Sequence, residues 1–311
     1  MDMTGPVVVV GPLAFDDVHA PAGHRAGLLG GSGAYASLAA AKYGEVMLVS
    51  IAGSDLDDAT LAPLRNANVD LAGLERTAGR TLRWSAMYSE DFAQSTVRNT
   101  DLGVVSGWRP RIPDAAADAG YLFLANTDPT VQRAALDQLR PDHVVVDTME
   151  EWIRERRSAL GALIARATIV SLNGPELTLL TGERDLVVAA NAILAQGPRA
   201  VIAKRGARGA ALLTRNGAFN VPAYPAVVLD PTGAGDALAG AFIARLARTG
   251  RDDEPALHDA LVAGVAAASL AVETFGISGL ARASRLDLDA RAAWLSRRAG
   301  TIPAAALYES R

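Results

Sequence analysis

The stretch VVLDPTGAGDALAGAFIARLA, residues 227–247, places an apolar strand end before a glycine-rich loop and a helix of small residues. The apolar run ends at Asp230, the loop carries Gly233 and Gly235, and a helical pattern runs from about Gly235 to Arg248. Glycines let backbone N–H groups approach a ligand closely, and the helix behind them adds its positive N-terminal end. The stretch therefore predicts an anion-binding loop at the start of a long helix.

Asp236 stands in the first turn of that predicted helix, directly beside the loop. Phosphoryl transfer needs charge neutralisation at the moving phosphoryl group and an acceptor for the proton of the attacking hydroxyl. The loop amides and Asp236 would supply these two functions. A glycine turn followed by an aspartate that the helix dipole favours is the alternative explanation, and the bare pattern G-x-G-D does not separate the two.

Short apolar runs alternate with helical patterns along the rest of the chain. Continuous apolar strands separated by helices are typical of a parallel sheet covered on both faces, so the sequence predicts an α/β fold. An alanine-rich run at 260–272 predicts a buried helix that is too short to span a bilayer. The other predicted elements are strands at 7–10, 46–51, 121–124, 144–146, 169–172 and 200–203, and helices at 38–43, 131–139, 153–165 and 187–195.

Two segments predict hairpins in place of crossover helices. Residues 81–99 alternate between apolar and polar side chains around a polar turn, and residues 14–29 fold around the turn-prone sequence APAG. Hairpins that project from an α/β body make a lid over a cleft. We expect a single domain of residues 1–311, with lid segments at about 14–29 and 80–107.

The overall composition is that of an ordinary globular protein, with 50% hydrophobic residues, 21% charged residues and a net charge of -4. This charge gives no electrostatic reason to expect nucleic acid or an anionic membrane as the partner. The sequence contains no cysteine, which excludes disulfides and thiolate chemistry and is compatible with a reducing compartment. The N-terminus has no signal-peptide pattern, so we expect a cytoplasmic protein.

Missing sequence motifs exclude two other classes of enzyme and give no sign of a histidine metal site. An NAD-linked oxidoreductase needs G-x-G-x-x-G directly after the first strand, where residues 11–17 read GPLAFDD, and a Walker-type NTPase needs G-x-x-x-x-G-K-[ST], which does not occur. The four histidines show no paired metal-binding spacing, so we expect a surface or structural role for each of them: His19, His24, His143 and His258.

The string DPTGAGDALAGAF, residues 230–242, is similar to the signature of the ribokinase family of PfkB-type carbohydrate kinases. That resemblance implies a ribokinase-like three-layer α/β/α sandwich with a mostly parallel sheet and a small β lid. It also implies an ATP-dependent kinase that phosphorylates a hydroxyl of a sugar or nucleoside. In the family, the aspartate of the motif is the catalytic base and the preceding amides hold the γ-phosphate, roles that carry over to Asp236 and to Gly233, Ala234 and Gly235.

Two N-terminal stretches, VVVVGPLAFDD and LLGGSGAYASLAAAKYG, resemble the family's first signature, with a substrate-binding aspartate and a Gly-Gly pair. Asp16, Gly30 and Gly31 match these positions, and a carboxylate and close amides suit a hydroxyl-rich ligand. Tyr35 and Ala14 replace two asparagines of ribokinase, so two sugar contacts are missing. An aromatic ring at Tyr35 favours stacking on a base or a ring, and packing in the core is the alternative.

TIVSLNGPELTLLTG, residues 168–182, resembles the family's N-x-x-E motif, which implies that Asn173 and Glu176 act on Mg²⁺ and phosphate through water. The alternative is an ordinary helix start, since Asn at the N-cap, Pro at N1 and Glu in the first turn are generally preferred there.

AVIAKRGARGAALLTRNG, residues 200–217, resembles the nucleotide-binding hairpin of the family, and a plain hairpin with solvated basic residues is the alternative. The family also commonly binds a monovalent cation such as K⁺ beside the anion hole. Asp230 and the carbonyl of Thr232 offer oxygens of the kind that such a cation prefers. The resemblance thus implies that ATP is bound by Asn173, Lys204, Gly206, Gly209 and Thr232.

Three functions stay open at this point. The first is a kinase of a free sugar or nucleoside, and the second is a phosphofructokinase-like kinase of a sugar phosphate, which needs basic residues near the lid. The third is a non-catalytic protein of the same fold that senses a nucleotide or sugar. We further expect a small-molecule partner and a homodimer formed through the lid. The arginines available for a sugar phosphate are Arg25, Arg80, Arg83 and Arg98.

Overall fold

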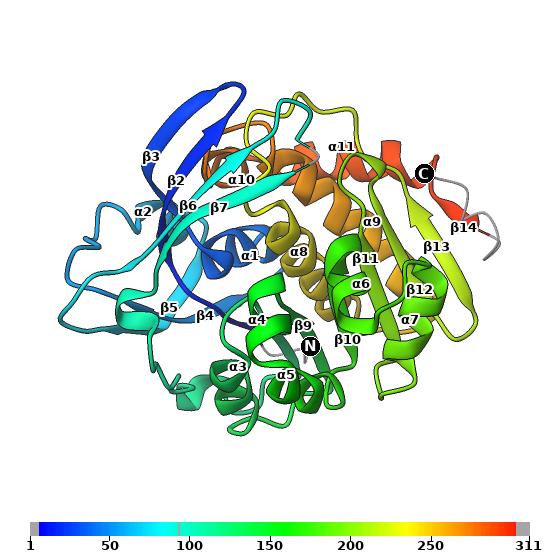
Figure 1. Cartoon of the computed structure of the whole chain (residues 1–311), viewed down its shortest axis with the longest axis horizontal. Coiled ribbons are helices and arrows are strands. Elements are labelled where there is room, and N and C mark those ends of the chain that lie inside the picture. The colour runs from blue at the N-terminus through cyan, green and yellow to red at the C-terminus, as the bar shows by residue number, and fades with distance from the viewer. Residues whose placement is uncertain (1–5, 93, 303–311) are drawn as a thin grey trace.

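A computed structural model describes residues 6–92 and 94–302, and Figure 1 colours them along the chain. Within these residues, ten strands form one large sheet and four strands form a second, smaller one. The large sheet contains, in spatial order, β14 (Gly300–Ile302), β13 (Gly217–Val221), β12 (Ala210–Thr214), β11 (Ala200–Lys204), β10 (Ile169–Asn173), β9 (His143–Asp147), β8 (Tyr121–Leu124), β1 (Val7–Val10), β4 (Val46–Ala52) and β5 (Val69–Arg76).

The strands from β11 to β5 pair in parallel, and the three from β12 to β14 continue the sheet antiparallel. The predicted strands are all present, and the hairpin of β11 and β12 is confirmed. Strands β5, β13 and β14 were not predicted from the sequence. The central strand β1 is four valines, all buried, as expected of a strand covered on both faces.

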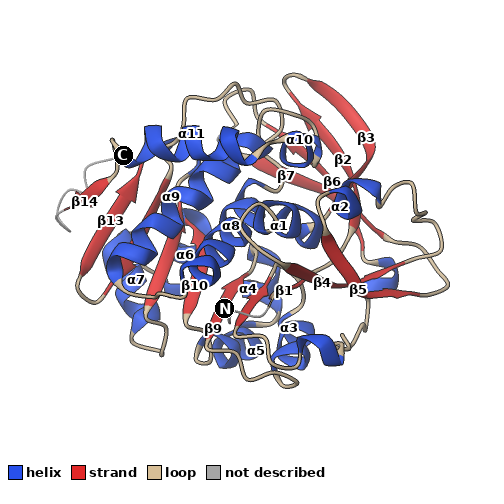
Figure 2. Cartoon of the chain, turned by 180° about the vertical axis from the view of Figure 1, so that it is seen from behind, coloured by secondary structure: helices blue, strands red, loops and turns tan. Residues whose placement is uncertain are grey.

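Helices cover both faces of the large sheet. Val7 and Val9 of β1 belong to one core cluster, and Val8 and Val10 belong to the other, because successive side chains of a strand point to opposite faces. The three-layer α/β/α sandwich is therefore confirmed. The layer nearer the viewer in Figure 2 contains α1 (Ser32–Ala40), α2 (Ala62–Asn66), α8 (Ala234–Thr249), α9 (Glu254–Ala271), α10 (Ser278–Arg282) and α11 (Arg285–Ser296).

The opposite layer faces the viewer in Figure 1 and contains α3 (Pro129–Leu136), α4 (Glu150–Glu155), α5 (Arg157–Ile164), α6 (Gly174–Thr181) and α7 (Leu186–Leu194). Three short 3₁₀ turns also occur among the described residues, at η1 (Gly103–Val105), η2 (Asp114–Ala116) and η3 (Gly206–Arg208). None of the helices described here has the length and apolar character needed to cross a membrane.

Two predicted helices need correction. The helix expected at 38–43 begins earlier, at Ser32, and ends at Ala40. The helix expected at 153–165 is two helices, α4 and α5, because Arg156 leaves the helical region with φ -126° and ψ 26°. Arg156 makes an ion pair of 3.2 Å with Asp128 on the neighbouring loop. The helices expected at 131–139 and 187–195 are present as α3 and α7 with shifted ends.

The smaller sheet has the order β3 (Gly23–Gly30), β2 (Ala14–Ala20), β6 (Leu82–Tyr88) and β7 (Ser95–Asp101). Both hairpins predicted from the sequence are confirmed, since β2 pairs with β3 and β6 with β7, each antiparallel. Figure 1 shows this sheet at one side of the large one. Along β2, Asp16 is buried, whereas Asp17 and His19 are partly exposed on the other face.

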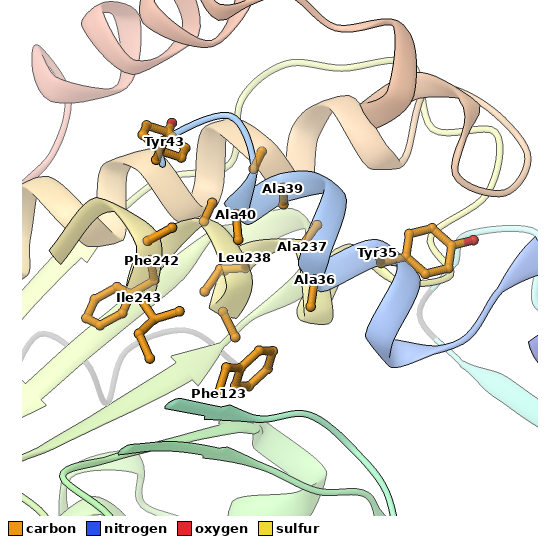
Figure 3. Packing of buried hydrophobic residues seen from close by; sticks show 14 of the residues in the cluster. Tyr35, Ala36, Ala39, Ala40, Tyr43, Phe123, Ala237, Leu238, Phe242 and Ile243 are labelled. Atoms are coloured by element: carbon orange, nitrogen blue, oxygen red, sulfur yellow. The ribbon is translucent and has the colours of Figure 1, made fainter. Parts of the chain in front are cut away.

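Helix α8 crosses α1 at backbone contact, and Figure 3 shows the small residues that line the crossing, among them Ala36, Ala39, Ala40 and Ala237. A Cβ atom on Gly240 would lie only 2.3 Å from the carbonyl oxygen of Ala36. The absence of a side chain at Gly240 is thus what lets the two helices approach so closely. This contact fixes where α8 begins.

A matched pair of helix glycines tests this packing. Gly240→Ala should lower the free energy of unfolding by about 1–3 kcal/mol, because the new methyl group overlaps the α1 backbone. Gly161→Ala in α5 should instead raise it by roughly 0.5–1 kcal/mol, because an added Cβ there meets no atom within 4 Å and alanine favours the helix. Urea denaturation measures both variants. Equal stability of Gly240→Ala and wild type would contradict the close contact.

Candidate active site

Three neighbouring parallel strands end in polar residues at the same edge of the large sheet. Asp147 ends β9, Asn173 ends β10 and Lys204 ends β11, and the register pairs Ser171 with Asp147 and Asn173 with Lys204. Ligand sites of α/β sheets form at the carboxyl ends of their strands. The start of α8 and the smaller sheet meet this edge, where they enclose a cavity of about 330 Å³.

The cavity walls bring together many, but not all, of the residues singled out in the sequence. Those that line the cavity are Asp16, Gly31, Tyr35, Asn173, Glu176, Thr232, Gly233 and Asp236. Those that do not line this cavity, within the described part of the chain, are Gly30, Lys204, Gly206, Gly209, Asp230, Ala234 and Gly235. Sequence reasoning missed further wall residues, including Trp84, Tyr88, Asn126, Met149, Glu151 and Trp152.

The glycine-rich loop has the geometry expected of an anion-binding helix start. Gly233 is the residue before α8 and has the left-handed dihedrals φ 74° and ψ 0°. A Cβ there would also lie 2.2 Å from the ring of Tyr35, so both backbone and space require glycine. The N–H of Ala234 donates a 3.3 Å hydrogen bond to Pro231 O. The N–H groups of Gly235 and Asp236 belong to the first turn, where a helix offers no acceptor of its own.

Lys204 and Asp147 form a buried ion pair beside this loop. The Lys204 Nζ donates to both carboxylate oxygens of Asp147, at 2.8 and 2.7 Å, and the two side chains are 16% and 3% exposed. A Cβ added to Gly235 would lie 3.2 Å from the same Nζ, so the ammonium group is next to the loop. Burial alone lowers the pKa of Lys204, but the carboxylates of Asp147 and Glu176 outweigh it and raise that pKa. Lys204 therefore stays charged.

The charges of Lys204 and Asp147 act on the pKa of two nearby carboxyl groups, those of Asp236 and Glu176. Burial, followed by the negative charge of Asp147, raises the pKa of Asp236 to about 7. The same two causes raise the pKa of Glu176 to about 7, and in both cases Lys204 opposes the rise. A carboxylate with such a pKa can take up a proton near neutral pH, which is the property that a general base needs.

Asp147 was not predicted as a site residue. It directly follows the predicted strand at 144–146, just as Asn173 follows the strand at 169–172. A polar residue at the carboxyl end of a parallel strand was thus the signal that could have identified it. Its partner Lys204 lies on β11, two strands away, so the pairing itself depends on the sheet order.

Asp16 presents an unsatisfied carboxylate oxygen in the cavity wall. The side chain is 2% exposed, and its Oδ2 has no hydrogen-bond partner among the described residues. Burial, and then the charges of Asp230 and Asp236, raise the pKa of Asp16 to about 8, against the opposing N–H of Gly31. A Cβ on Gly30 would lie 1.8 Å from this oxygen, so the neighbouring glycine leaves room for it. The oxygen is suited to accept a hydrogen bond from a hydroxyl group of a ligand.

Aromatic side chains form much of the remaining wall. Tyr88 donates to or accepts from Thr232 Oγ1 at 2.9 Å, which joins the smaller sheet to the glycine-rich loop. Trp84 and Trp152 line the same cavity. Tyr35 is 1% exposed and packs against Gly233, as core packing predicts, yet its hydroxyl has no partner in the part of the chain described. The ring of Tyr35 therefore belongs both to the core and to the cavity wall.

The helix-start explanation of the N-x-x-E segment is correct at the level of local structure. The Asn173 side chain accepts from the Glu176 N–H at 2.8 Å, and the Glu176 carboxylate accepts from the Asn173 N–H at 2.7 Å. This capping box begins α6. It also holds Glu176 at the cavity wall, so capping and a role towards a cation are compatible.

Asp230 joins two loops behind the glycine-rich loop. Its Oδ1 accepts from the Thr232 N–H at 2.9 Å, and its Oδ2 accepts from the Gly276 N–H at 3.0 Å. The side chain is fully buried. In the hairpin of β11 and β12, Gly206 and Gly209 lie in the turn, and a Cβ on Gly209 would lie 2.0 Å from Val221 O. The turn thus packs against the end of β13.

Comparison with known proteins decides the family. Residues 8–282 match the model of the pfkB family of carbohydrate kinases. The chain belongs to this family. It is 31% identical over 250 residues to cytidine kinase of Thermococcus kodakarensis, a match that covers 78% of this chain and 88% of that protein. It is 28% identical over 273 residues to ATP-dependent ribose-1-phosphate kinase of Halopiger xanaduensis, a match that covers 86% of this chain and 87% of that protein.

Solved structures of pfkB-type and ribokinase-family kinases share the fold. The nucleoside kinase of Methanocaldococcus jannaschii superposes with a TM-score of 0.76 at 19% identity, over 93% of this chain and 99% of that one. The aminoimidazole riboside kinase of Salmonella enterica superposes with a TM-score of 0.72 at 23% identity, over 93% and 100%. The predicted ribokinase-like fold is thereby confirmed, and the match to the pfkB family confirms the kinase class.

The residues at this edge of the sheet fit the phosphate groups and the metal ion that a pfkB-family kinase would bind. The first-turn N–H groups of α8 and the Lys204 ammonium offer positive potential to an anion. The carboxylates of Asp147, Glu176 and Asp236 are oxygen donors of the kind that Mg²⁺ prefers. Mg²⁺, when bound, would neutralise charge on the phosphate groups.

The buried ion pair generates a stability prediction. Lys204→Met should lower the free energy of unfolding by about 3–5 kcal/mol, because it leaves the Asp147 carboxylate buried without its cation. The double variant Lys204→Met/Asp147→Asn should recover most of that loss, because the uncompensated charge is also removed. Urea denaturation at pH 8 gives the comparison. A double variant as unstable as the single one would show that the pair does not account for the effect.

Proposed function

We propose that this pfkB-family kinase transfers the γ-phosphoryl group of ATP to a hydroxyl group of a nucleoside or sugar, with Asp236 as general base. The observation that carries the proposal is the position of Asp236, a partly buried carboxylate whose pKa is raised to about 7, in the first turn of α8 beside the glycine-rich loop. Asp236 accepts the proton of the attacking hydroxyl. The loop amides of Gly233 and Gly235, that of Ala234 once it releases Pro231 O, and the Lys204 ammonium stabilise negative charge on the phosphoryl group.

The acceptor molecule is held at the other side of the cavity. Asp16 accepts hydrogen bonds from its hydroxyl groups through the unsatisfied Oδ2, and Gly30 and Gly31 let the chain lie close to it. The lid strands β2 and β6 cover the cavity and exclude water, which protects the phosphoryl group from hydrolysis. Asn173 and Glu176 are placed to position Mg²⁺ and phosphate through water.

A nucleoside is favoured over a free sugar as the acceptor. The cavity wall carries four aromatic rings, and flat rings suit a planar base better than a saturated sugar. One relative of high coverage is named cytidine kinase, which supports the same choice. The aromatic wall residues are Tyr35, Trp84, Tyr88 and Trp152.

A sugar phosphate is the less well supported acceptor, because the four lid arginines are engaged away from the cavity. Arg83 pairs with Asp55 and Arg80 lies 3.8 Å from Asp101. Arg25 lies over the ring of Phe275, and Arg98 contacts His19. None of the four lines the described cavity.

The other family features stay predictions. They are the binding of ATP by Thr232, Gly206 and Gly209, a K⁺ ion at Asp230, and a single domain that dimerises through its lid in the cytoplasm.

An acceptor panel tests the proposed reaction. Nucleosides, free sugars and sugar phosphates are each incubated with ATP and Mg²⁺, and ADP release is measured. Nucleosides should give the highest kcat/KM, and Asp236→Asn should lower kcat by about 10²–10⁴-fold while calorimetric affinity for ATP stays within a few-fold. Asp118→Asn, which removes an exposed carboxylate, is the matched control. Undiminished turnover by Asp236→Asn would remove Asp236 from its proposed role.

The pH dependence follows from the raised pKa of the base. Since Asp236 acts when it is deprotonated, kcat/KM should be constant at high pH and should fall about tenfold per pH unit below about 7. Glu176 has a pKa of about 7 and Asp16 one of about 8, so the profile reports the three carboxyl groups together. A rate that stays constant down to pH 5 would contradict a base of raised pKa.

A further inference from the structure

The outer face of the lid carries three metal-ligating side chains at the end of the β2–β3 hairpin. Asp17 and His19 are two residues apart on β2, so their side chains share one face of the strand. His24 of β3 lies directly opposite His19 in the antiparallel register. The hairpin turn therefore brings two imidazoles and one carboxylate together.

Their ligand atoms lie close together, and His24 and Asp17 share a hydrogen bond. The Nε2 atom of His24 is 2.6 Å from Asp17 Oδ1, and the Nε2 atom of His19 is 3.4 Å from the same oxygen. The two rings are stacked with centroids 3.9 Å apart and an interplanar angle of 6°, so both present the same edge to Asp17. One ligand atom from each residue lies within 4.8 Å of the others. A tetrahedral ion with bonds of about 2.0–2.2 Å needs ligand atoms roughly 3.4 Å apart, so the hydrogen bond between His24 and Asp17 has to open and the two rings have to turn towards the ion.

We propose that Asp17, His19 and His24 bind a divalent transition metal ion, of which Zn²⁺ is the representative. Two imidazole nitrogens and a carboxylate are ligands that Zn²⁺ accepts, whereas Mg²⁺ prefers oxygen ligands alone. The side chains are 30%, 51% and 41% exposed for His19, His24 and Asp17, so an ion reaches them without unfolding and water completes its coordination. Among the described residues this is the group of His and acidic side chains that meets the geometry of a metal site.

The proposal departs from the sequence-based expectation of a surface or structural role for His19 and His24. His19 and His24 are five residues apart, a separation that places them together only because a tight turn folds one strand back on the other. Sequence spacing along a helix does not reveal such a pair. The register of the hairpin does.

One neighbouring cation opposes the ion. Arg98 of β7 has its Nη1 atom 3.5 Å from the Nε2 atom of His19, so the guanidinium has to release this nitrogen before a metal can bind it. The negative charge of Asp17 partly offsets the positive charges of Arg98 and the metal ion. Arg98→Gln should therefore bind Zn²⁺ several-fold more tightly than wild type.

The bound ion would tie β2 to β3 at the hairpin end. Asp17 is the neighbour of Asp16, whose side chain lies on the opposite face of β2 in the cavity wall. Constraint of the hairpin would thus act on the lid while the metal itself stays outside the acceptor cavity. The site does not depend on the proposed phosphoryl transfer.

Nuclear magnetic resonance of the imidazole nitrogens tests the site directly. The full chain, with any affinity tag removed, is titrated with ZnCl₂, and the ring signals of its four histidines are followed. The signals of His19 and His24 should shift and saturate at one equivalent, while those of His143 and His258 stay in place. The same titration with MgCl₂ should leave all four unchanged.

Calorimetry with variants supplies the second arm. His19→Ala, His24→Ala and Asp17→Asn should each weaken Zn²⁺ binding at least tenfold, because each removes one of three ligands. His258→Ala, which removes a ring stacked on Phe219, should bind as wild type does. Zn²⁺ binding that persists unchanged in His24→Ala would place the ion elsewhere, such as at the carboxylates beside Asp236, and would overturn the proposal. Failure of the His19 and His24 signals to shift at millimolar Zn²⁺ would overturn it as well.

Discussion

The backbone contact between α1 and α8 is the constraint on which the site depends. Gly240 lets α8 lie against the carbonyl oxygen of Ala36, and the same pair of helices brings Gly233 against the ring of Tyr35. Because a helix is stiff, two contacts along it fix its direction and the position of its first turn. The glycine-rich loop and Asp236 therefore occupy their places through the packing of α8 against α1.

Charge balance is the second constraint, and it follows from burial. Asp147, Glu176 and Asp236 gather at one edge of the sheet with Lys204 as the cation that faces them. Burial, and then the excess of three carboxylates over one ammonium, raises the pKa of Asp236 and that of Glu176 to about 7. A divalent cation would neutralise this excess of negative charge, so the site is suited to a metal-bound substrate.

Local sequence patterns predicted the elements better than their ends. The buried strands were predicted correctly because a short β-branched run such as Val7 to Val10 strongly favours a strand. The hairpins were predicted correctly because the alternating pattern and the turn residues indicate the same structure. The break at Arg156 was missed, since neither proline nor glycine marks it and the cause is a contact with Asp128 from another loop. Strand β14 was missed because its partner β13 lies about 80 residues away along the chain, whereas β13 itself also pairs with the neighbouring β12.

The sequence by itself determined the family and pointed to the candidate loop and base, because DPTGAGD is a local motif whose glycines and aspartate stand next to one another along the chain. Only the tertiary structure decided that Lys204 pairs with Asp147, that Trp84 and Trp152 share a wall, and that His19 meets His24 beside Asp17. These pairings join residues from different strands and loops. Which of them meet is set by sheet order and register, which depend on the packing of the whole chain.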